Sequence, residues 1–523
     1  MILRREFIVR GKRVELEEIE GVAAVKTEAE LARRMSSEDL SRAFGARAEP
    51  PRGGTEKKDW EAFQNAGWMF VRPSADVDRS LRSRSPIENI EAVQRVFRHP
   101  NGRILLGTDL LSIRLRNEMS EDQAKAILQE EGLEIVRQLR FAPNLFEVRT
   151  RPGRRDSLQV SLDLSSNPNI VYAEPQFIEH IPPRFTPTDP DYGQQWHLNN
   201  SGQNGGTAGA DISAEEAWDI TRGAGVQIAI IDNGFDLDHP DLGAAVTDTS
   251  GFFRMDGMGN AQFVQDVNGY PDSSHGTFCA GMAIARANNG EGGCGVANQA
   301  DFIAVACLGD QVGTQVTLAR AVAYAADPRQ EVLDANPDDG ADIIACSLGP
   351  NGADWNMTQT LQDAIDFAVT NGRGRLGTPI LWAVTNGNFE IRFDEVCSYP
   401  NTIHVGRSTN RDREDDCGFG PELDFLATGV DVYSTDSGGG YTTSTGTSFA
   451  APTAAGVATL LLAVNPNLTW QEVRQRLRDT CDKIGGVVYD ANGHNNDYGW
   501  GRVNAYRVVT QQSRQMSVQE DVS

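Results

Sequence analysis

The second part of this chain almost lacks lysine. After residue 183 the sequence contains a single lysine, Lys483, and the whole net charge of −25 falls in that part. Such a surface repels the phosphates of nucleic acids and of anionic membranes, so we expect neither as a partner. Two explanations of the acidity stay open: it keeps the protein in solution, or it supplies oxygen ligands to a hard cation such as calcium.

Long apolar stretches are also missing. No window approaches the roughly eighteen consecutive apolar residues that suggest a membrane-spanning helix. Residues 1–10 are basic, but the apolar core and small-residue cleavage site of a secretory signal do not follow them. We therefore expect a cytoplasmic protein without a membrane span, with secretion as the alternative.

Cysteine is sparse, and its spacing excludes a zinc site. The seven cysteines include no CxxC pair and no other spacing typical of zinc ligands. Most of them lie in apolar runs, where a free cysteine behaves as a small buried hydrophobic residue.

Residues 1–100 carry no pattern that points to chemistry. Two short apolar runs flank Gly11 and predict a hairpin, whereas residues 45–58 predict a flexible linker. Ser85 followed by Pro86 predicts the start of a helix. We describe this segment as an N-terminal extension of unknown role, either a structural addition or a docking module that gates the rest of the chain.

Residues 101–182 predict a small α+β domain. Their patterns follow the order β-α-β-β-α-β, the split ferredoxin-like arrangement. Ser120 caps the first helix, and Gln123 completes a capping box. The segment 174–192 contains five prolines and predicts an extended, exposed linker.

Residues 183–510 alternate apolar runs with helical patterns, and residues 511–523 form a tail. This alternation is typical of an α/β domain with a buried, mostly parallel sheet flanked by helices. The apolar runs lie at 226–231, 301–307, 341–347 and 379–384, and the helical patterns at 276–287, 315–326, 358–371, 448–464 and 469–479. Active sites in such sheets lie beyond the carboxyl ends of the strands.

Four polar residues stand at these strand ends or helix starts. Asp232 ends the first apolar run, Asn388 follows the fourth, His275 precedes a helix and Ser448 opens a long one. Each also has a simpler explanation as a turn or capping residue. In this chain order an acid, an imidazole and a hydroxyl, with an amide between the last two, indicate a nucleophilic serine.

With these motifs, residues 190–510 resemble the subtilase family of serine endopeptidases, and in part its kexin and furin branch. The likeness extends to Gln195-Trp-His-Leu, His239-Pro-Asp-Leu and Gly499-Trp-Gly-Arg. It implies a subtilisin-like sheet and hydrolysis of peptide substrates through an acyl-enzyme. The implied catalytic triad is Asp232, His275 and Ser448, with Asn388 and the Ser448 N–H as oxyanion donors, and Ser347, Leu348 and Gly349 as the strand that binds substrate.

The resemblance also implies calcium as a cofactor. The family's ligands fall on Asp189, Asp241 and Asn289, with backbone carbonyls near Arg286, Glu291 and Gly293. Carboxylate, amide and carbonyl oxygens suit calcium, although ordinary turn residues remain the alternative.

Subtilases commonly carry a ferredoxin-like module ahead of the peptidase. The resemblance therefore implies that residues 101–182 are an inhibitor-like propeptide, an intramolecular partner of the peptidase. It further implies a zymogen that cuts itself between about 175 and 187. A non-catalytic binding protein on the same scaffold is the competing interpretation, but no triad or oxyanion residue is missing.

The match to the kexin and furin branch has gaps. Asn233 stands where that branch has a second aspartate after the catalytic acid. An acidic, basic-selective or calcium-bound rim built from Asp354, Asp394 and Asp415 stays open, as does the preference for the residue before the cleaved bond. Cys397 and Cys417 fall roughly where the furin branch has a disulfide, but we favour free thiols.

Overall fold

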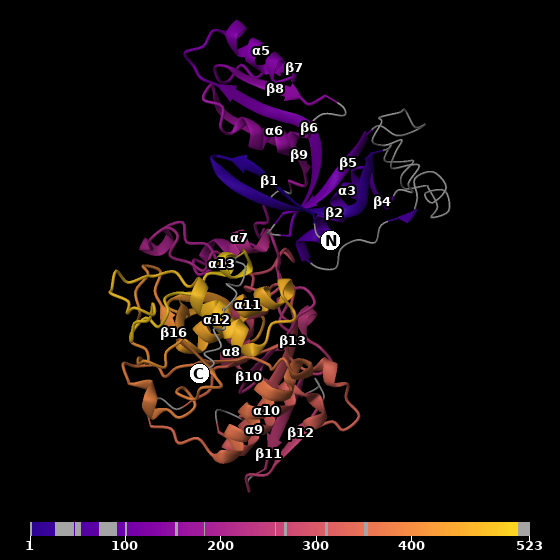
Figure 1. Cartoon of the computed structure of the whole chain (residues 1–523). Coiled ribbons are helices and arrows are strands. Elements are labelled where there is room, and N and C mark those ends of the chain that lie inside the picture. The colour runs from indigo at the N-terminus through magenta and orange to yellow at the C-terminus, as the bar shows by residue number, and fades with distance from the viewer. Residues whose placement is uncertain are drawn as a thin grey trace, which may run out of the picture. The chain divides into compact units, whose positions relative to one another are not determined.

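The computed structural model describes eleven stretches of the chain in two compact units, residues 1–182 and 183–523 (Figure 1). The described residues are 3–26, 46–47, 54–72, 92–99, 102–151, 155–181, 184–256, 258–265, 269–308, 312–349 and 354–510. The helix start predicted at Ser85 and the tail 511–523 lie outside them. We refer to residues 1–182 as unit 1 and to residues 183–523 as unit 2.

Unit 2 is built around an eight-stranded sheet with the order β12-β11-β13-β10-β14-β15-β16-β17. Every neighbouring pair from β11 to β17 is parallel, and only β12 pairs antiparallel. The strands are β10 (Gln227–Asp232), β11 (Gly251–Met255), β12 (Ala261–Val264), β13 (Asp301–Ala306), β14 (Ile343–Cys346), β15 (Ile380–Ala383), β16 (Ile403–Ser408) and β17 (Phe425–Thr428). The predicted α/β class with a mostly parallel sheet is confirmed.

Helices cover both faces of this sheet. Alternate residues of β10 enter different cores: Ile230 packs in the one that holds α8 and α11, and Ile231 in the one that holds α9 and α10. The helices of unit 2 are α7 (Ala214–Trp218), α8 (Ser274–Ile284), α9 (Gln315–Ala326), α10 (Gln359–Arg375), α11 (Thr447–Val464), α12 (Trp470–Thr480) and α13 (Ala505–Thr510), beside a hairpin of β18 (Val432–Asp436) and β19 (Gly440–Ser444). Burial on both faces explains the apolar runs of β10, β13, β14 and β15.

Helix α11 is long and apolar enough to cross a membrane. It lies in the core of unit 2, however, and 83% of its 18-residue apolar window is buried there. A central helix of a large α/β core meets the same criteria of length and composition, so the helix gives little support for a membrane span.

The ferredoxin-like half of unit 1 has the predicted element order. Its elements are β6 (Ile104–Leu115), α5 (Glu121–Glu130), β7 (Glu134–Gln138), β8 (Leu145–Arg149), α6 (Ser157–Leu164) and β9 (Ile170–Glu179). The strands pair antiparallel in the order β9-β6-β8-β7, and the capping box of Ser120 and Gln123 is present. The linker prediction was wrong for residues 174–179, which continue β9 along β6.

The N-terminal extension is joined to this half through one continuous sheet. β5 (Ala92–Arg98) pairs with the first residues of β6, so the nine-stranded sheet crosses the predicted boundary at residue 100. The predicted hairpin is confirmed: β1 (Leu3–Val9) and β2 (Lys12–Lys26) meet at a two-residue turn with positive φ. The other elements of the extension in the described residues are β3 (Ala46–Arg47), α3 (Gly54–Asn65) and β4 (Trp68–Arg72), so the linker predicted at 45–58 was wrong where these elements occupy it.

Candidate active site

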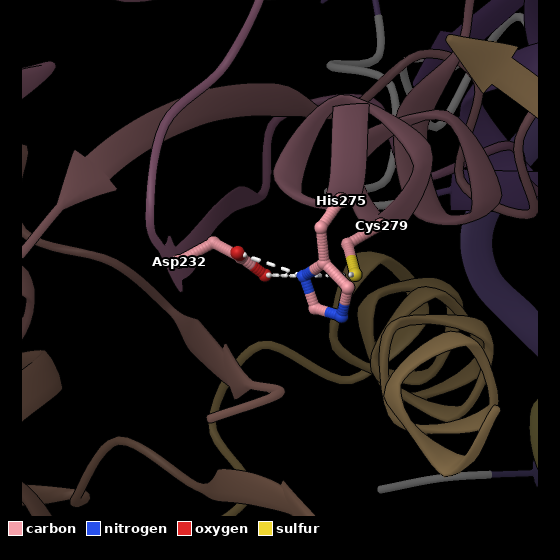
Figure 2. A group of neighbouring side chains, drawn as sticks. All are labelled: Asp232, His275 and Cys279. Atoms are coloured by element: carbon pink, nitrogen blue, oxygen red, sulfur yellow. Dashed lines mark hydrogen bonds and ion pairs between the residues drawn. The ribbon is translucent and has the colours of Figure 1, made fainter. Parts of the chain in front are cut away.

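Asp232 and His275 form a hydrogen-bonded pair at the carboxyl end of β10 (Figure 2). Nδ1 of His275 lies 2.9 and 3.0 Å from the two carboxylate oxygens of the wholly buried Asp232. Because an ionised carboxylate only accepts, Nδ1 carries the proton and Nε2 of the neutral ring is left as an acceptor. A Cβ at Gly276 would lie 2.0 Å from the Gly234 carbonyl oxygen, so glycine lets α8 begin against the end of β10.

Cys279 lies beside the imidazole, one turn further along α8. Its sulfur is 4.0 Å from Nδ1 of His275. The pKa of His275 is raised, first by this sulfur and then by the Asp232 carboxylate, against the opposing effect of burial. Burial raises the pKa of the Cys279 thiol, against the opposing effect of His275.

The three side chains offer nitrogen, oxygen and sulfur atoms within 4.8 Å of one another, which is also a possible metal-binding geometry. Nδ1 of His275 is already hydrogen-bonded to Asp232, so a metal ion bound at this nitrogen would compete with that hydrogen bond. All seven cysteines are free and buried, including Cys397 and Cys417.

Ser448 is the second residue of α11, so it is not the helix cap that the simpler explanation required. Its hydroxyl donates to the Ser347 carbonyl at 3.4 Å. The Cys279 sulfur that borders His275 also donates to the Ser448 carbonyl, at 3.2 Å, and the Phe449 ring lies 5.8 Å from the imidazole. Ser448 and His275 therefore border the same sulfur, although the described residues include no recorded hydrogen bond between their side chains.

Pro452 lies inside α11, beyond the first turn of the helix, which begins at Thr447. Its missing N–H leaves the Ser448 carbonyl without the helical donor four residues on. The Ser347 hydroxyl donates to that carbonyl at 2.7 Å, and the Cys279 thiol donates as well. Two side chains thus hold the Ser448 backbone where the helix itself does not.

The predicted substrate strand directly follows β14. Among the described residues, the Ser347 carbonyl accepts the 3.4 Å bond from the Ser448 hydroxyl and no other recorded side-chain bond, and Gly349 is exposed. The Leu348 carbonyl accepts a hydrogen bond of 2.9 Å from the Trp382 indole, so it is already occupied. Backbone groups of Ser347 and Gly349 are the ones left to pair with an extended peptide.

Asn388 lies in the loop after β15, with an exposed side chain for which the described residues include no recorded hydrogen bond. Its neighbour Asn386 instead fixes the start of α11: its side-chain oxygen accepts from the Thr447 N–H at 3.1 Å and from Arg407 at 2.6 Å. Sequence reasoning missed Asn386 and Arg407, although Asn386 follows β15 more closely than Asn388 and Arg407 is the last residue but one of β16.

The predicted acidic rim is not assembled. Asp394 caps a turn by accepting the N–H groups of Val396 and Cys397, both at 3.0 Å. Asp415 pairs with Arg407 at 2.9 Å. Asp354 is exposed, whereas Asp394 is buried and Asp415 is half-buried. Asp354 takes no part in the turn cap of Asp394 or in the ion pair of Asp415.

Two buried carboxylates meet in the predicted calcium site. Asp189 accepts the backbone N–H groups of Asn288, Asn289 and Gly290 at 2.8, 3.1 and 3.3 Å. The Asn289 side chain donates to Asp241 at 2.6 Å, so the sequence-distant residues are brought together. Burial, reinforced by the charge of Asp189, raises the pKa of Asp241.

No lysine or arginine among the described residues pairs with either carboxylate of this cluster. Burying negative charge without a counter-charge is unfavourable, and a hard cation with oxygen ligands relieves it. The remaining predicted ligands lie around the same loop: the Arg286 N–H donates to the Asp241 carbonyl, the Glu291 N–H donates to the Asn289 side chain, and Gly293 packs against Gln195. The two buried carboxylates therefore fit calcium, which prefers oxygen ligands.

Comparisons with known proteins agree with this architecture. Residues 223–501 match the subtilase family, peptidase family S8. A calcium-dependent protease of Nostoc sp. is 30% identical over 481 residues, which cover 83% of this chain and 68% of the relative. Human proprotein convertase subtilisin/kexin type 4 is 31% identical over 60% of this chain and 41% of its own length. A solved protease structure from Pseudoalteromonas arctica is 27% identical, covers 62% of this chain and 99% of its own, and superposes with a TM-score of 0.51.

The match to the Nostoc protease covers more of the chain than unit 2 contains, so it extends into unit 1. The family match alone spans more than half of the chain, and it contains the aspartate, histidine and serine described above. The chain therefore belongs to the subtilase family and is a subtilisin-like serine endopeptidase.

Proposed function

We propose that Asp232, His275 and Ser448 form the catalytic triad of this endopeptidase. The observation that carries the proposal is the pair of hydrogen bonds from His275 Nδ1 to the buried Asp232, which leaves Nε2 as the base. Ser448 Oγ attacks the scissile carbonyl while Nε2 takes its proton, and the imidazolium then protonates the leaving amine. Water hydrolyses the acyl-enzyme by the same route in reverse.

The resting position of the Ser448 hydroxyl suggests how substrate engages it. The hydroxyl donates to the Ser347 carbonyl, which is also the acceptor that an added substrate strand would use. A substrate N–H that bonds this carbonyl displaces the hydroxyl, which then turns toward Nε2. Hydrogen bonds of catalytic groups are commonly long or misaligned before substrate binds.

The oxyanion is received by the Ser448 N–H and the Asn388 side chain in this proposal. The Ser448 N–H lies in the first turn of α11, where backbone donors have no helical partners. Asn388 is exposed and follows Gly387, whose φ of 98° belongs to a tight turn, so its side chain is available to a bound peptide. Each such donor contributes about 10²–10³ in turnover.

The proposed enzyme also binds a calcium ion and carries an upstream inhibitory domain. Asp189, Asp241 and Asn289 would hold a calcium ion, which neutralises the two carboxylates and stabilises the loop around them. A relative that covers 83% of this chain is named a calcium-dependent protease, in support of this role. The ferredoxin-like half of unit 1 is the proposed intramolecular inhibitor, and the chain is the proposed zymogen that removes it.

Replacing Ser448 with alanine tests the triad. We expect Ser448→Ala to lower the hydrolysis of casein by at least about a thousandfold, with unchanged circular dichroism. Ser444→Ala, at the end of the nearby β19, is the matched control and should keep full activity. Equal activity of the two variants would remove Ser448 from the mechanism.

A further inference from the structure

Helix α11 begins without a capping side chain of its own. The residue before it is Gly446, which has no side chain to accept the first backbone N–H groups of the helix. Asn386, in the loop after β15, supplies an acceptor instead. Its Oδ1 accepts from the Thr447 N–H at 3.1 Å and from the Thr447 hydroxyl at 3.2 Å. The start of the helix that carries Ser448 is therefore held by a distant part of the chain.

Arg407 of β16 holds this asparagine in place. Its Nη1 donates to the same Oδ1 of Asn386 at 2.6 Å. Its Nε donates to the carbonyl and the side chain of Asp415 at 2.8 and 2.9 Å, and its Nη2 donates to the Asp416 carbonyl at 3.3 Å. All three nitrogens of this buried guanidinium are thus engaged. Because hydrogen bonds from a charged donor are the stronger ones, the arginine fixes the amide oxygen of Asn386 against α11.

The same arginine reaches the turn that carries Asn388. The Asp416 carbonyl that accepts from Arg407 also accepts the Gly387 N–H at 2.8 Å. Asn388 follows this glycine directly, and its side chain is exposed, so its position depends on the backbone of the turn. Arg407 therefore contacts a support of the turn as well as the support of the helix start.

We propose that Arg407 is a positioning residue that sets the relative placement of the two oxyanion donors, the Ser448 N–H and the Asn388 side chain. The inference rests on the proposed function, where those donors are assigned. Arg407 acts through Asn386 on α11 and through the Asp416 carbonyl on the turn, without touching substrate. A misplacement of about 1 Å can cost about 100-fold in rate, so fixing both donors from one guanidinium favours the transition state over the bound substrate.

A purely structural role for Arg407 predicts a different result. The guanidinium also pairs with the half-buried Asp415, so its loss leaves that carboxylate without a counter-charge. In that case the Tm falls, while kcat and KM of the folded protein stay at the wild-type values. Kinetics therefore separates the two roles, whereas stability does not.

The first test is Arg407→Met, which keeps the length of the side chain and removes every donor. We expect kcat for a peptide substrate to fall about 10- to 100-fold with KM nearly unchanged. Arg407→Lys keeps the charge without the three-nitrogen fork and should lie between this variant and wild type. Arg411→Met is the matched control: it removes an exposed arginine of the loop after β16, whose guanidinium donates to the Gly205 carbonyl, and it should keep both constants.

Asn386→Ala tests whether the arginine acts through the asparagine. It should also lower kcat, and the double variant with Arg407→Met should lose little more than the weaker of the two single variants. Losses that multiply in the double variant would contradict the coupling. If Arg407→Met is not folded by circular dichroism, Arg407→Lys and Asn386→Ala decide, and an unchanged kcat in both would contradict the inference.

A peptide boronic acid gives a readout that a structural role does not move. The Ser448 hydroxyl adds to boron, its proton passes to His275, and the tetrahedral complex gains a negative charge with one oxygen in the oxyanion hole. The Ki of this inhibitor should rise in Arg407→Met by the factor by which kcat/KM falls. An unchanged Ki in the folded variant, or a loss confined to KM, overturns the inference.

Comparison with Ser448→Ala separates this inference from the proposed function. Hydrolysis that depends on Ser448 but not on Arg407 would contradict the inference alone. Wild-type protein as inactive as Ser448→Ala would contradict the proposed function as well.

Discussion

The two units of this chain place their important contacts in opposite ways. Unit 2 is built on a mostly parallel sheet with helices on both faces, and the Asp232–His275 pair lies at the end of one of its strands. In unit 1 an antiparallel sheet is shared by two halves, and aromatic and ionic contacts are spread along it. The Asp232–His275 pair lies in unit 2, whereas the stability of unit 1 depends on a sheet that continues through both of its halves. Changes at one edge of unit 2 should alter turnover, and changes in unit 1 should alter stability.

The largest effect should come from Asp232→Asn, at the strand end of unit 2. An amide favours the wrong tautomer of His275 and no longer stabilises the imidazolium, so we expect kcat/KM to fall by about 10⁴. The Cys279 sulfur and, after it, the Asp232 carboxylate raise the pKa of His275, so removal of the carboxylate should also move the acid limb of the kcat/KM profile to lower pH. Unfolding of both units should change little.

Rates of peptide hydrolysis between pH 5 and 10, for wild type and Asp232→Asn, check this. An acid limb that stays in place would mean that Asp232 does not set the charge on the base.

A substitution in the core of unit 1 should lower stability rather than turnover. Trp60 in α3 stacks on Phe70 at 3.6 Å in a core that also contains Ile104 and Leu106 of β6. Trp60→Ala should lower the free energy of unfolding of unit 1 by about 3–5 kcal/mol and carry the ferredoxin-like half with it, because β6 belongs to both. Calorimetry should show the transition of unit 2 unmoved. Two separate transitions within unit 1 would contradict the shared sheet.

Calcium removal should destabilise unit 2 alone. If calcium is held at about 100–1,000 times its Kd, chelation lowers the free energy of unfolding by about 3–4 kcal/mol. Asp241→Asn should abolish this response because it removes one of the two buried carboxylates, whereas Asp238→Asn, on the exposed part of the same loop, should keep it. Thermal unfolding with and without chelator measures the difference. An unchanged response in Asp241→Asn would place the ion elsewhere.

Acid should produce the smallest of these effects, through a buried histidine of unit 2. Burial lowers the pKa of His404 to about 4, below the value of about 6.5 in an unfolded chain. Between those values the unfolded state binds a proton that the folded state does not, so stability falls as the pH drops. The full contribution is about 3 kcal/mol.

Urea unfolding at pH 7 and pH 5 checks this contribution. His404→Gln should lose less stability on acidification than wild type, while His494→Gln, a half-buried control, should follow wild type. Parallel behaviour of all three proteins would contradict the assignment.

The contrast between the units also explains what could be predicted from the sequence. The strands and helices of unit 2 and the placement of Asp232, His275 and Ser448 follow from apolar runs that stop at polar residues. The support of the Ser448 carbonyl could not be predicted, because it depends on where α11 begins relative to Pro452. That position is set by Asn386, which contacts Thr447 across sixty residues of sequence.

Unit 1 was predicted less completely for a physical reason. The ferredoxin-like order is local and was readable, down to the capping box at Ser120. The pairing of β5 with β6 and the extension of β9 to Glu179 are decided by partners across a sheet, and strands with mixed polarity carry no strong period.

Labelling of the nucleophile tests the central claim most directly. A fluorophosphonate that reacts with activated serines should give one covalent adduct on the wild-type protein, located at Ser448 by peptide mass spectrometry. The adduct should disappear in His275→Ala, which keeps the serine and removes the base. An adduct on another serine, or undiminished labelling of Ser448 without His275, would contradict the account.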